Sequence, residues 1–212
     1  MKHEDDYFII NYNENDKAYV SQLIKVLNEN MIKIMCFFCL TELKQKKVIN
    51  IWNNINEYEK YISPYVGEYQ EWMVADTFDN NINIISYDLC LSNETHKNCN
   101  MSNYKKIIIH EFVHACQQEI NPNAKNVIWF WEALATNLSE QEYSLINIPY
   151  TKSELINNFK HLKYAYPVSY TIGRYLLENY THEHILDYIK NPNLLLDDTE
   201  NILEETNAWV KR

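Results

Sequence analysis

Two histidines stand four residues apart in the segment KKIIIHEFVHACQQE, which covers residues 105–119. They are His110 and His114. Because an α-helix turns once in about 3.6 residues, side chains at this spacing share a face, and both imidazoles can bind one ion. Zinc accepts imidazole nitrogens at about 2.0–2.1 Å in tetrahedral sites. The spacing therefore indicates a metal site, and we expect Zn²⁺ there. Cobalt or nickel would also suit two imidazoles and a carboxylate.

Glu111 directly follows the first histidine. On a helix it is rotated by about 100° from His110, so it is poorly placed to be a third ligand. It can reach a water molecule on the metal, which is the position that a general base requires. The alternative is a buried helix with two core histidines, because the five-residue pattern alone has many chance matches.

A third ligand is expected from NVIWFWEALATN, residues 126–137, where Glu132 stands in an apolar helix start. A catalytic zinc site has three protein ligands and one open position. A buried carboxylate is costly unless a cation compensates it. The alternative is that Glu132 is only a first-turn residue, favoured there by the helix dipole.

Together, HEFVH and the later WFWEALA resemble the gluzincin metallopeptidases, particularly their small peptidase-MA-like members. The resemblance covers roughly residues 45–190, loosely outside these two motifs. The chain has Ala133 where the family usually has glycine after the third ligand. The metzincin pattern does not fit, because Ile120 stands where its third histidine is expected.

The resemblance implies a role for each matching residue. The implied zinc ligands are His110, His114 and Glu132, with Glu111 as the base and acid. A tyrosine that opens the downstream helix would stabilise the oxyanion. Tyr166 is the predicted tyrosine, and Tyr164 and Tyr170 are its competitors.

These residues predict a zinc-dependent peptidase that acts on a peptide or protein substrate. The segment INIISYDL, residues 82–89, is expected to be an edge strand that pairs with an extended substrate. A catalytically inactive, peptidase-like binding or regulatory protein is the first alternative. A helical protein without a metal is the second.

The predicted fold class is α+β, with a zincin-like arrangement. Strands are expected at residues 7–12, 47–52, 71–78 and 82–89, and helices at 16–43, from 55 and at 103–120. Further helices are expected at 129–143, from 151, at 167–180 and over the C-terminal residues. The predicted domain is a single catalytic one, residues 1–212, with a mixed lobe at 1–102 and a helical lobe at 103–212.

Composition narrows the classes of partner and location. The 212 residues carry a formal net charge of −10, which disfavours a nucleic-acid partner. The longest apolar stretch, MIKIMCFFCL, contains a lysine and is too short to span a bilayer. The N-terminus lacks an apolar signal segment, so a cytoplasmic protein without membrane contact is expected. Nothing in the sequence predicts the oligomeric state.

Five cysteines form no regular disulfide pattern. Cys36 and Cys39 are interpreted as two small buried side chains on one helix face, rather than as a redox or zinc pair. Cys90 and Cys99 flank a polar loop, and whether they pair is left open.

Overall fold

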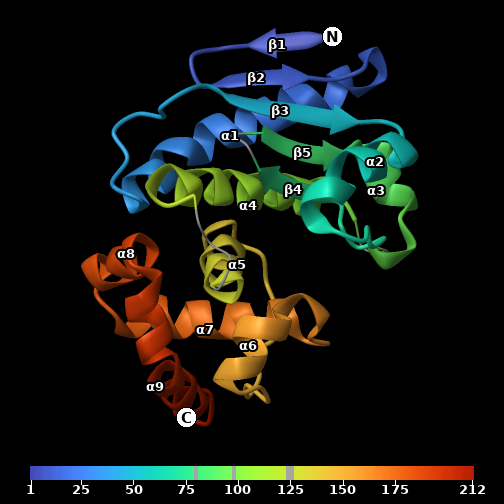
Figure 1. Cartoon of the computed structure of the whole chain (residues 1–212). Coiled ribbons are helices and arrows are strands. Elements are labelled where there is room, and N and C mark those ends of the chain that lie inside the picture. Colours follow the sequence, from blue (N-terminus) through green and yellow to red (C-terminus); the bar gives the residue numbers. More distant parts are fainter. Residues whose placement is uncertain (79–80, 97–98, 123–126) are drawn as a thin grey trace. The chain divides into compact units, whose positions relative to one another are not determined.

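The computed structural model describes residues 1–78, 81–96, 99–122 and 127–212 (Figure 1). The chain divides into two compact units, Met1–Cys116 and Gln117–Arg212. The boundary lies inside the long helix Met101–Ile120, whereas the lobes expected from the sequence divide between residues 102 and 103, in the first turn of that helix. The assignment of the whole chain to one catalytic domain stays a prediction.

The first unit contains a five-stranded mixed sheet in the order β1-β2-β3-β5-β4. Its strands are β1 (Lys2–Glu4), β2 (Phe8–Asn11), β3 (Lys47–Trp52), β4 (Ala75–Phe78) and β5 (Asn81–Ile85). The three inner strands are parallel, and β1 and β4 run antiparallel to their neighbours at the two edges. The sheet and the helices around it confirm the predicted α+β class.

The two faces of the sheet differ in chemistry. On one face an amide ladder crosses three strands: Asn11 donates to Asn50 (2.9 Å), and Asn50 donates to Asn83 (3.1 Å). On the other face Ile49 pairs in register with Ile82, and both are buried. The alternation of β3 therefore directs its isoleucines toward the core, as a half-buried strand requires.

Four α-helices belong wholly or largely to the first unit: α1 (Lys17–Phe37), α2 (Ile55–Val66), α3 (Tyr87–Ser92) and α4 (Met101–Ile120). Asn54 caps α2 by accepting from the amides of Asn56 and Glu57. Short 3₁₀ turns lie at Glu14–Asp16 and Glu94–His96.

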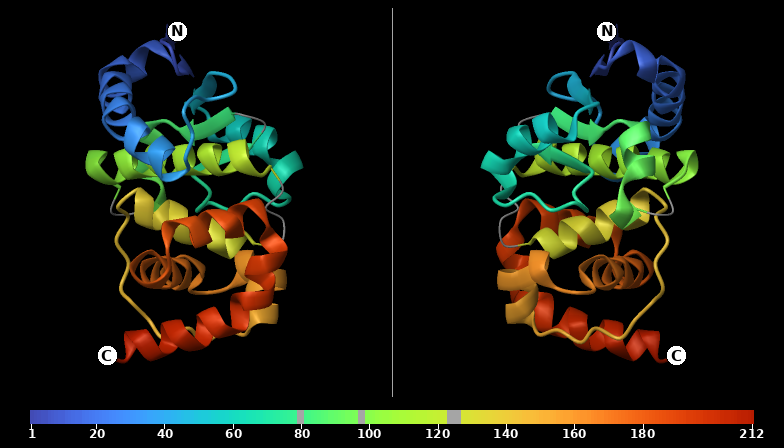
Figure 2. Two further views of the ribbon diagram at one scale, coloured as in Figure 1. Left: turned by 90° about the vertical axis from the view of Figure 1, so that its left-hand side faces the viewer. Right: turned by 90° about the vertical axis from the view of Figure 1, so that its right-hand side faces the viewer.

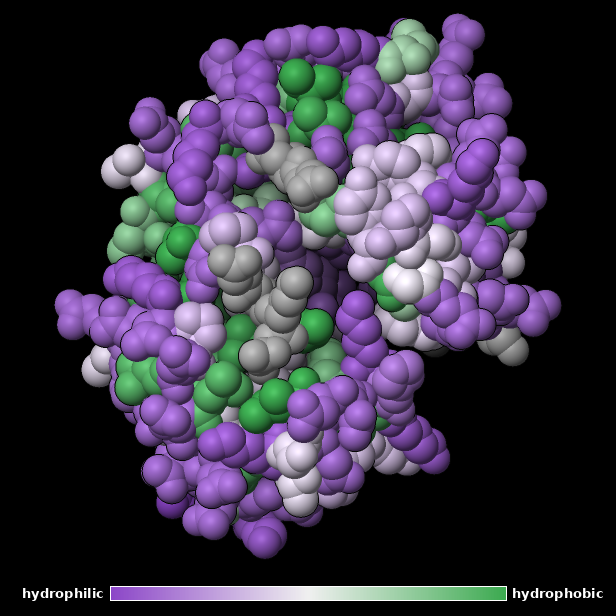
Figure 3. Space-filling view, viewed as in Figure 1, coloured by the Kyte–Doolittle hydropathy of each residue, from purple (hydrophilic) through white to green (hydrophobic). Residues whose placement is uncertain are grey.

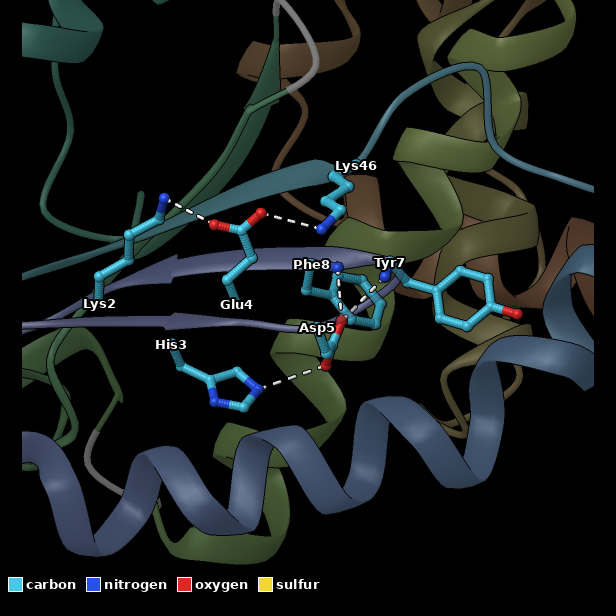
Figure 4. Close-up of polar contacts among 7 residues, drawn as sticks. All are labelled: Lys2, His3, Glu4, Asp5, Tyr7, Phe8 and Lys46. Carbon is cyan, nitrogen blue, oxygen red and sulfur yellow. Dashed lines mark hydrogen bonds and ion pairs between the residues drawn. The ribbon is translucent and has the colours of Figure 1, made fainter.

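Polar side chains shape the turn between β1 and β2 (Figure 4). Asp5 accepts from the backbone amides of Tyr7 (2.9 Å) and Phe8 (2.7 Å), which reverses the chain. Beside it, Glu4 lies between Lys2 and Lys46 at 2.7 and 2.9 Å. These contacts explain why the charged N-terminal residues, for which the sequence predicts no strand, form the edge strand β1.

The second unit is helical in the part that the structure describes (Figures 1 and 2). Its α-helices are α5 (Ile128–Leu138), α6 (Lys152–Asn158), α7 (Ala165–Asn179), α8 (His182–Lys190) and α9 (Pro192–Val210), with a 3₁₀ turn at Phe159–His161. A capping box of Thr151 and Glu154 starts α6, where the sequence predicts a helix from residue 151.

Helices α5 and α7 approach each other closely at Gly173. A Cβ atom placed there would overlap the Ala133 carbonyl oxygen and the Asn137 side-chain nitrogen. That nitrogen donates to the carbonyl oxygens of Ala133 (2.8 Å) and Tyr170 (3.1 Å), so it is held in place. The α5 segment that carries Glu132 is thereby packed against a rigid neighbour.

Three sequence-based expectations about elements are wrong. The strand predicted over residues 82–89 ends at Ile85, because the Ser86 hydroxyl accepts from the Leu89 amide and starts α3. That strand, β5, lies between β3 and β4, so it is not the sheet edge. The helix predicted over 129–143 ends at Leu138.

The interpretation of Cys36 and Cys39 as buried is also wrong, since both are exposed free thiols. Helix α1 ends at Phe37, and Cys39 adopts the left-handed conformation (φ 53°) beyond it. The amides of Cys39 and Leu40 bond to the carbonyls of Cys36 and Met35, which is the Schellman arrangement.

Cys90 and Cys99 form a disulfide between α3 and the start of α4. The pairing that the sequence leaves open is therefore present. Disulfides are typical of oxidising compartments, so this bond does not favour the cytoplasmic location, which stays a prediction.

Hydrophilic residues dominate the face shown in Figure 3, in keeping with a chain that is 23% charged. Among the described residues, no helix combines the length and the apolar character needed to cross a membrane.

Candidate metal centre

Helix α4 is anchored at its start and near its middle. Asn100 caps its start by accepting from the Asn103 amide (3.0 Å). The Tyr104 hydroxyl donates to the Ile85 carbonyl (2.7 Å), which ties the first turn to β5. Further along, Phe112 meets Phe8 of β2 edge to face at 5.6 Å. These contacts fix the rotation of α4 and therefore the direction of its polar side chains.

The two histidines of α4 point at a common position. Their Nε2 atoms are 3.0 Å apart, and the rings stand at 82° to each other. His110 is only 6% exposed, and His114 is partly buried. Two nitrogens at about 2.05 Å from one tetrahedral zinc would lie about 3.3 Å apart. The observed separation is close to that value, so the pair has the spacing of two ligands to one ion.

Glu111 contacts strand β4. One carboxylate oxygen, Oε2, accepts from the Thr77 hydroxyl at 2.7 Å. The carboxylate is buried, with 6% of the residue exposed. Glu111 and the paired imidazoles thus belong to the same helix, and the role of Glu111 as a base stays a prediction.

Glu132 lies in an otherwise apolar stretch of α5, whose residues from Trp129 to Thr136 are otherwise buried. Gln117, three residues beyond His114 on α4, donates its Nε2 to the Trp131 carbonyl at 3.2 Å. This bond joins the last turns of α4 to the residue before Glu132.

One ligand atom from each of His110, His114 and Glu132 lies within 4.8 Å of the other two. These are the three side chains that the sequence predicts as ligands, and their role as ligands stays a prediction. Two nitrogens and one carboxylate oxygen are the donor set of many catalytic zinc sites. The residues present fit a divalent transition metal.

Of the predicted tyrosines, Tyr166 lies in the first turn of α7 and is partly buried. Its ring stacks on that of Tyr143 (6.4 Å, 15°), which also contacts Tyr170 at 5.8 Å. Tyr164 is 44% exposed, ahead of α7. Burial raises the pKa of Tyr143, and the negative charge of Glu132 raises it further.

Tyr143 is a site neighbour that the sequence analysis misses. It follows the end of α5, where Glu140 takes a left-handed conformation (φ 58°) and the chain turns back. The sequence analysis extends the helix of α5 through this residue, whereas the structure ends that helix at Leu138, so the position predicted for the ring is wrong.

A comparison of the chain with family models, curated proteins and solved structures finds no match.

Proposed function

We propose that this protein is a zinc-dependent peptidase with a zincin-like fold of the gluzincin type. The observation that carries the proposal is the pair of imidazole Nε2 atoms 3.0 Å apart on α4, with a glutamate between them in sequence. The carboxylate of Glu132, within 4.8 Å of the imidazole nitrogens, completes the expected ligand set.

His110, His114 and Glu132 are the residues that would hold zinc. When bound, zinc would lower the pKa of a coordinated water and polarise the carbonyl of the scissile bond. Two neutral imidazoles and one carboxylate leave a net positive charge on such a centre. A positive charge at the metal would help to deprotonate a bound water molecule, whereas a set of several thiolates is typical of structural zinc sites.

Glu111 is the proposed general base. Its Oε2 atom is bonded to Thr77, which leaves Oε1 to accept the proton of the attacking water. The same carboxyl then gives that proton to the departing amine nitrogen, so no net proton is gained or lost by the protein. General acid–base catalysis of this kind contributes about 10²- to 10⁴-fold.

Tyr166 is the proposed hydrogen-bond donor to the oxyanion. Two observations support this role for Tyr166 over Tyr164. Tyr166 lies in the first turn of α7, and its ring stacks on that of Tyr143, whose pKa is raised by burial and by the charge of Glu132. Tyr170 contacts the same ring and remains its competitor.

The strand proposed to pair with the substrate is now β4 and not β5, because β4 is the last strand of the sheet order. An extended peptide added to β4 would be bound through its main chain, with little dependence on its sequence. Thr77 of the same strand contacts Glu111, so a peptide on this edge would run beside the base.

The test is a Glu111→Gln variant beside a Glu142→Gln control, an exposed glutamate of the second unit. Both proteins should bind zinc as the wild type does. We expect Glu111→Gln to cleave a mixed peptide library at least about 10²-fold more slowly, and the control to cleave at the wild-type rate. Full cleavage by Glu111→Gln would refute its role. Zinc binding without any cleavage by the wild type would favour the inactive, peptidase-like binding protein instead.

A further inference from the structure

We propose that Thr77 is a positioning residue, which holds the Glu111 carboxylate in the orientation that proton transfer requires. This inference rests on the proposed function. It concerns a residue on the sheet edge, outside the two motifs from which that function is inferred.

The Thr77 hydroxyl has one proton and two acceptors within reach. Glu111 Oε2 lies at 2.7 Å, and the Glu111 backbone carbonyl oxygen lies at 3.1 Å. The carboxylate is both closer and charged, so it takes the proton in a charge-assisted bond. The hydroxyl of Thr77 thus contacts both the backbone carbonyl and the carboxylate of Glu111, which restricts the three side-chain torsions between these two groups.

Both partners are held by rigid elements. Thr77 is paired in register with the buried Ile82 of β5, so it faces the apolar side of the sheet. The next residue, Phe78, faces the other side and stacks on Tyr65 of α2 at 3.8 Å. Strand β4 is thus fixed on both faces, and its alternation directs the hydroxyl toward α4.

The two carboxylate oxygens of Glu111 therefore have different roles. Oε2 is occupied by a donor that cannot be the substrate, and Oε1 is left for the proton of the water. Without the hydroxyl, the carboxylate could rotate among several rotamers, of which few would face the metal centre. The loss should therefore appear in kcat, because the hydroxyl binds neither substrate nor metal.

The experiment compares Thr77→Val, which removes the hydroxyl at nearly constant volume, with Thr77→Ser, which keeps it. Thr41→Val, at an exposed position of the same unit, is the control. We expect kcat of Thr77→Val to fall about 10- to 100-fold, as for other partners that orient a site residue. KM and zinc content should stay within about twofold of the wild type. Thr77→Ser should recover most of kcat.

A second measurement does not depend on activity. In metal-free protein, Thr77→Val should lower the equilibrium constant for folding about tenfold more in the wild-type background than in the Glu111→Ala background. Such coupling shows that the hydroxyl acts on this carboxylate and not on the sheet alone.

Three results would overturn the proposal: a Thr77→Val enzyme as active as Thr41→Val, a Thr77→Ser enzyme as impaired as Thr77→Val, or no coupling between Thr77 and Glu111. A wild-type protein that binds zinc and cleaves no peptide would instead refute the proposed function, and the role of Thr77 would fall with it. The coupling measured in metal-free protein separates these two failures.

Discussion

Gly173 offers a test in which two physical effects have opposite signs. Alanine is favoured over glycine inside a helix by about 0.8–1.0 kcal/mol. A substitution at this position in α7 would therefore stabilise the protein if helix propensity decided the outcome. The structure predicts the reverse, because the added methyl group has no space.

The magnitude follows from what the methyl group would meet. A Cβ atom at residue 173 lies 2.9 Å from the Ala133 carbonyl carbon and still closer to two other atoms, the Ala133 oxygen and the Asn137 nitrogen. If Asn137 moves, its two hydrogen bonds are lost, at about 1 kcal/mol each. If α5 moves, overpacking costs about 1–3 kcal/mol. After subtracting the propensity gain, Gly173→Ala should destabilise the protein by about 1 kcal/mol if Asn137 moves and by up to about 2 kcal/mol if α5 moves.

The assay is urea unfolding of metal-free Gly173→Ala and of the control Arg174→Ala, at the exposed next position of α7. The control should stay within about 0.5 kcal/mol of the wild type, because its ion pair with Glu178 is exposed. Displacement of Ala133 should also move Glu132 and weaken zinc binding. An increase in the stability of Gly173→Ala would refute the close α5–α7 packing and the argument that α5 is rigidly held.

Two further predictions concern the first unit. Contacts with Lys2, and then with Lys46, lower the pKa of Glu4 to about 2. The stabilising effect of this carboxylate should therefore be present above pH 4.5 and disappear as the pH falls toward 2. About 1 M salt should raise the pKa by screening, and a carboxyl resonance of Glu4 that titrates near 4.5 at low salt would contradict this prediction. The Cys90–Cys99 disulfide joins residues nine apart. Its reduction should lower the unfolding free energy by about 2–3 kcal/mol and speed amide exchange in the first turn of α4. Equal stability with and without reductant would exclude a structural role.

The relative placement of His110 and His114 could be predicted from the sequence because it depends on local helix periodicity. The two side chains face one point on any regular helix, and the apolar residues before them favour that helix. The side-chain direction of Glu111 follows from the same periodicity. Its contact with Thr77 does not, since the two residues meet only after the sheet has formed.

Strand order could not be predicted in the same way. The apolar segment that begins at Ile82 is typical of a strand, but whether that strand lies inside the sheet or at its edge depends on pairing with distant segments. The short strand β4, with partly buried residues only, has the weaker pattern and forms the edge. The predicted strand runs past Ile85 because, in the sequence, a serine that caps a helix cannot be told from any other polar residue near the end of a strand.

Element ends were the other source of error. Helical spacing in the sequence runs past Phe37, yet the chain leaves the helix through Cys39 in a left-handed conformation that glycine usually adopts. The same happens at Glu140, beyond the end of α5. With only two glycines in the chain, neither of them at these positions, the usual signal for such a turn is missing.

The central claim is tested most directly by the metal content of the purified protein, measured with a ligand variant beside a matched control. We predict one zinc ion per chain in the wild type and in His161→Ala, an exposed histidine of the second unit. His114→Ala and Glu132→Gln should each lose zinc during dialysis against a moderate chelator. Stoichiometric zinc in Glu132→Gln with unchanged affinity, or a wild-type protein that takes up no divalent metal, would contradict the account.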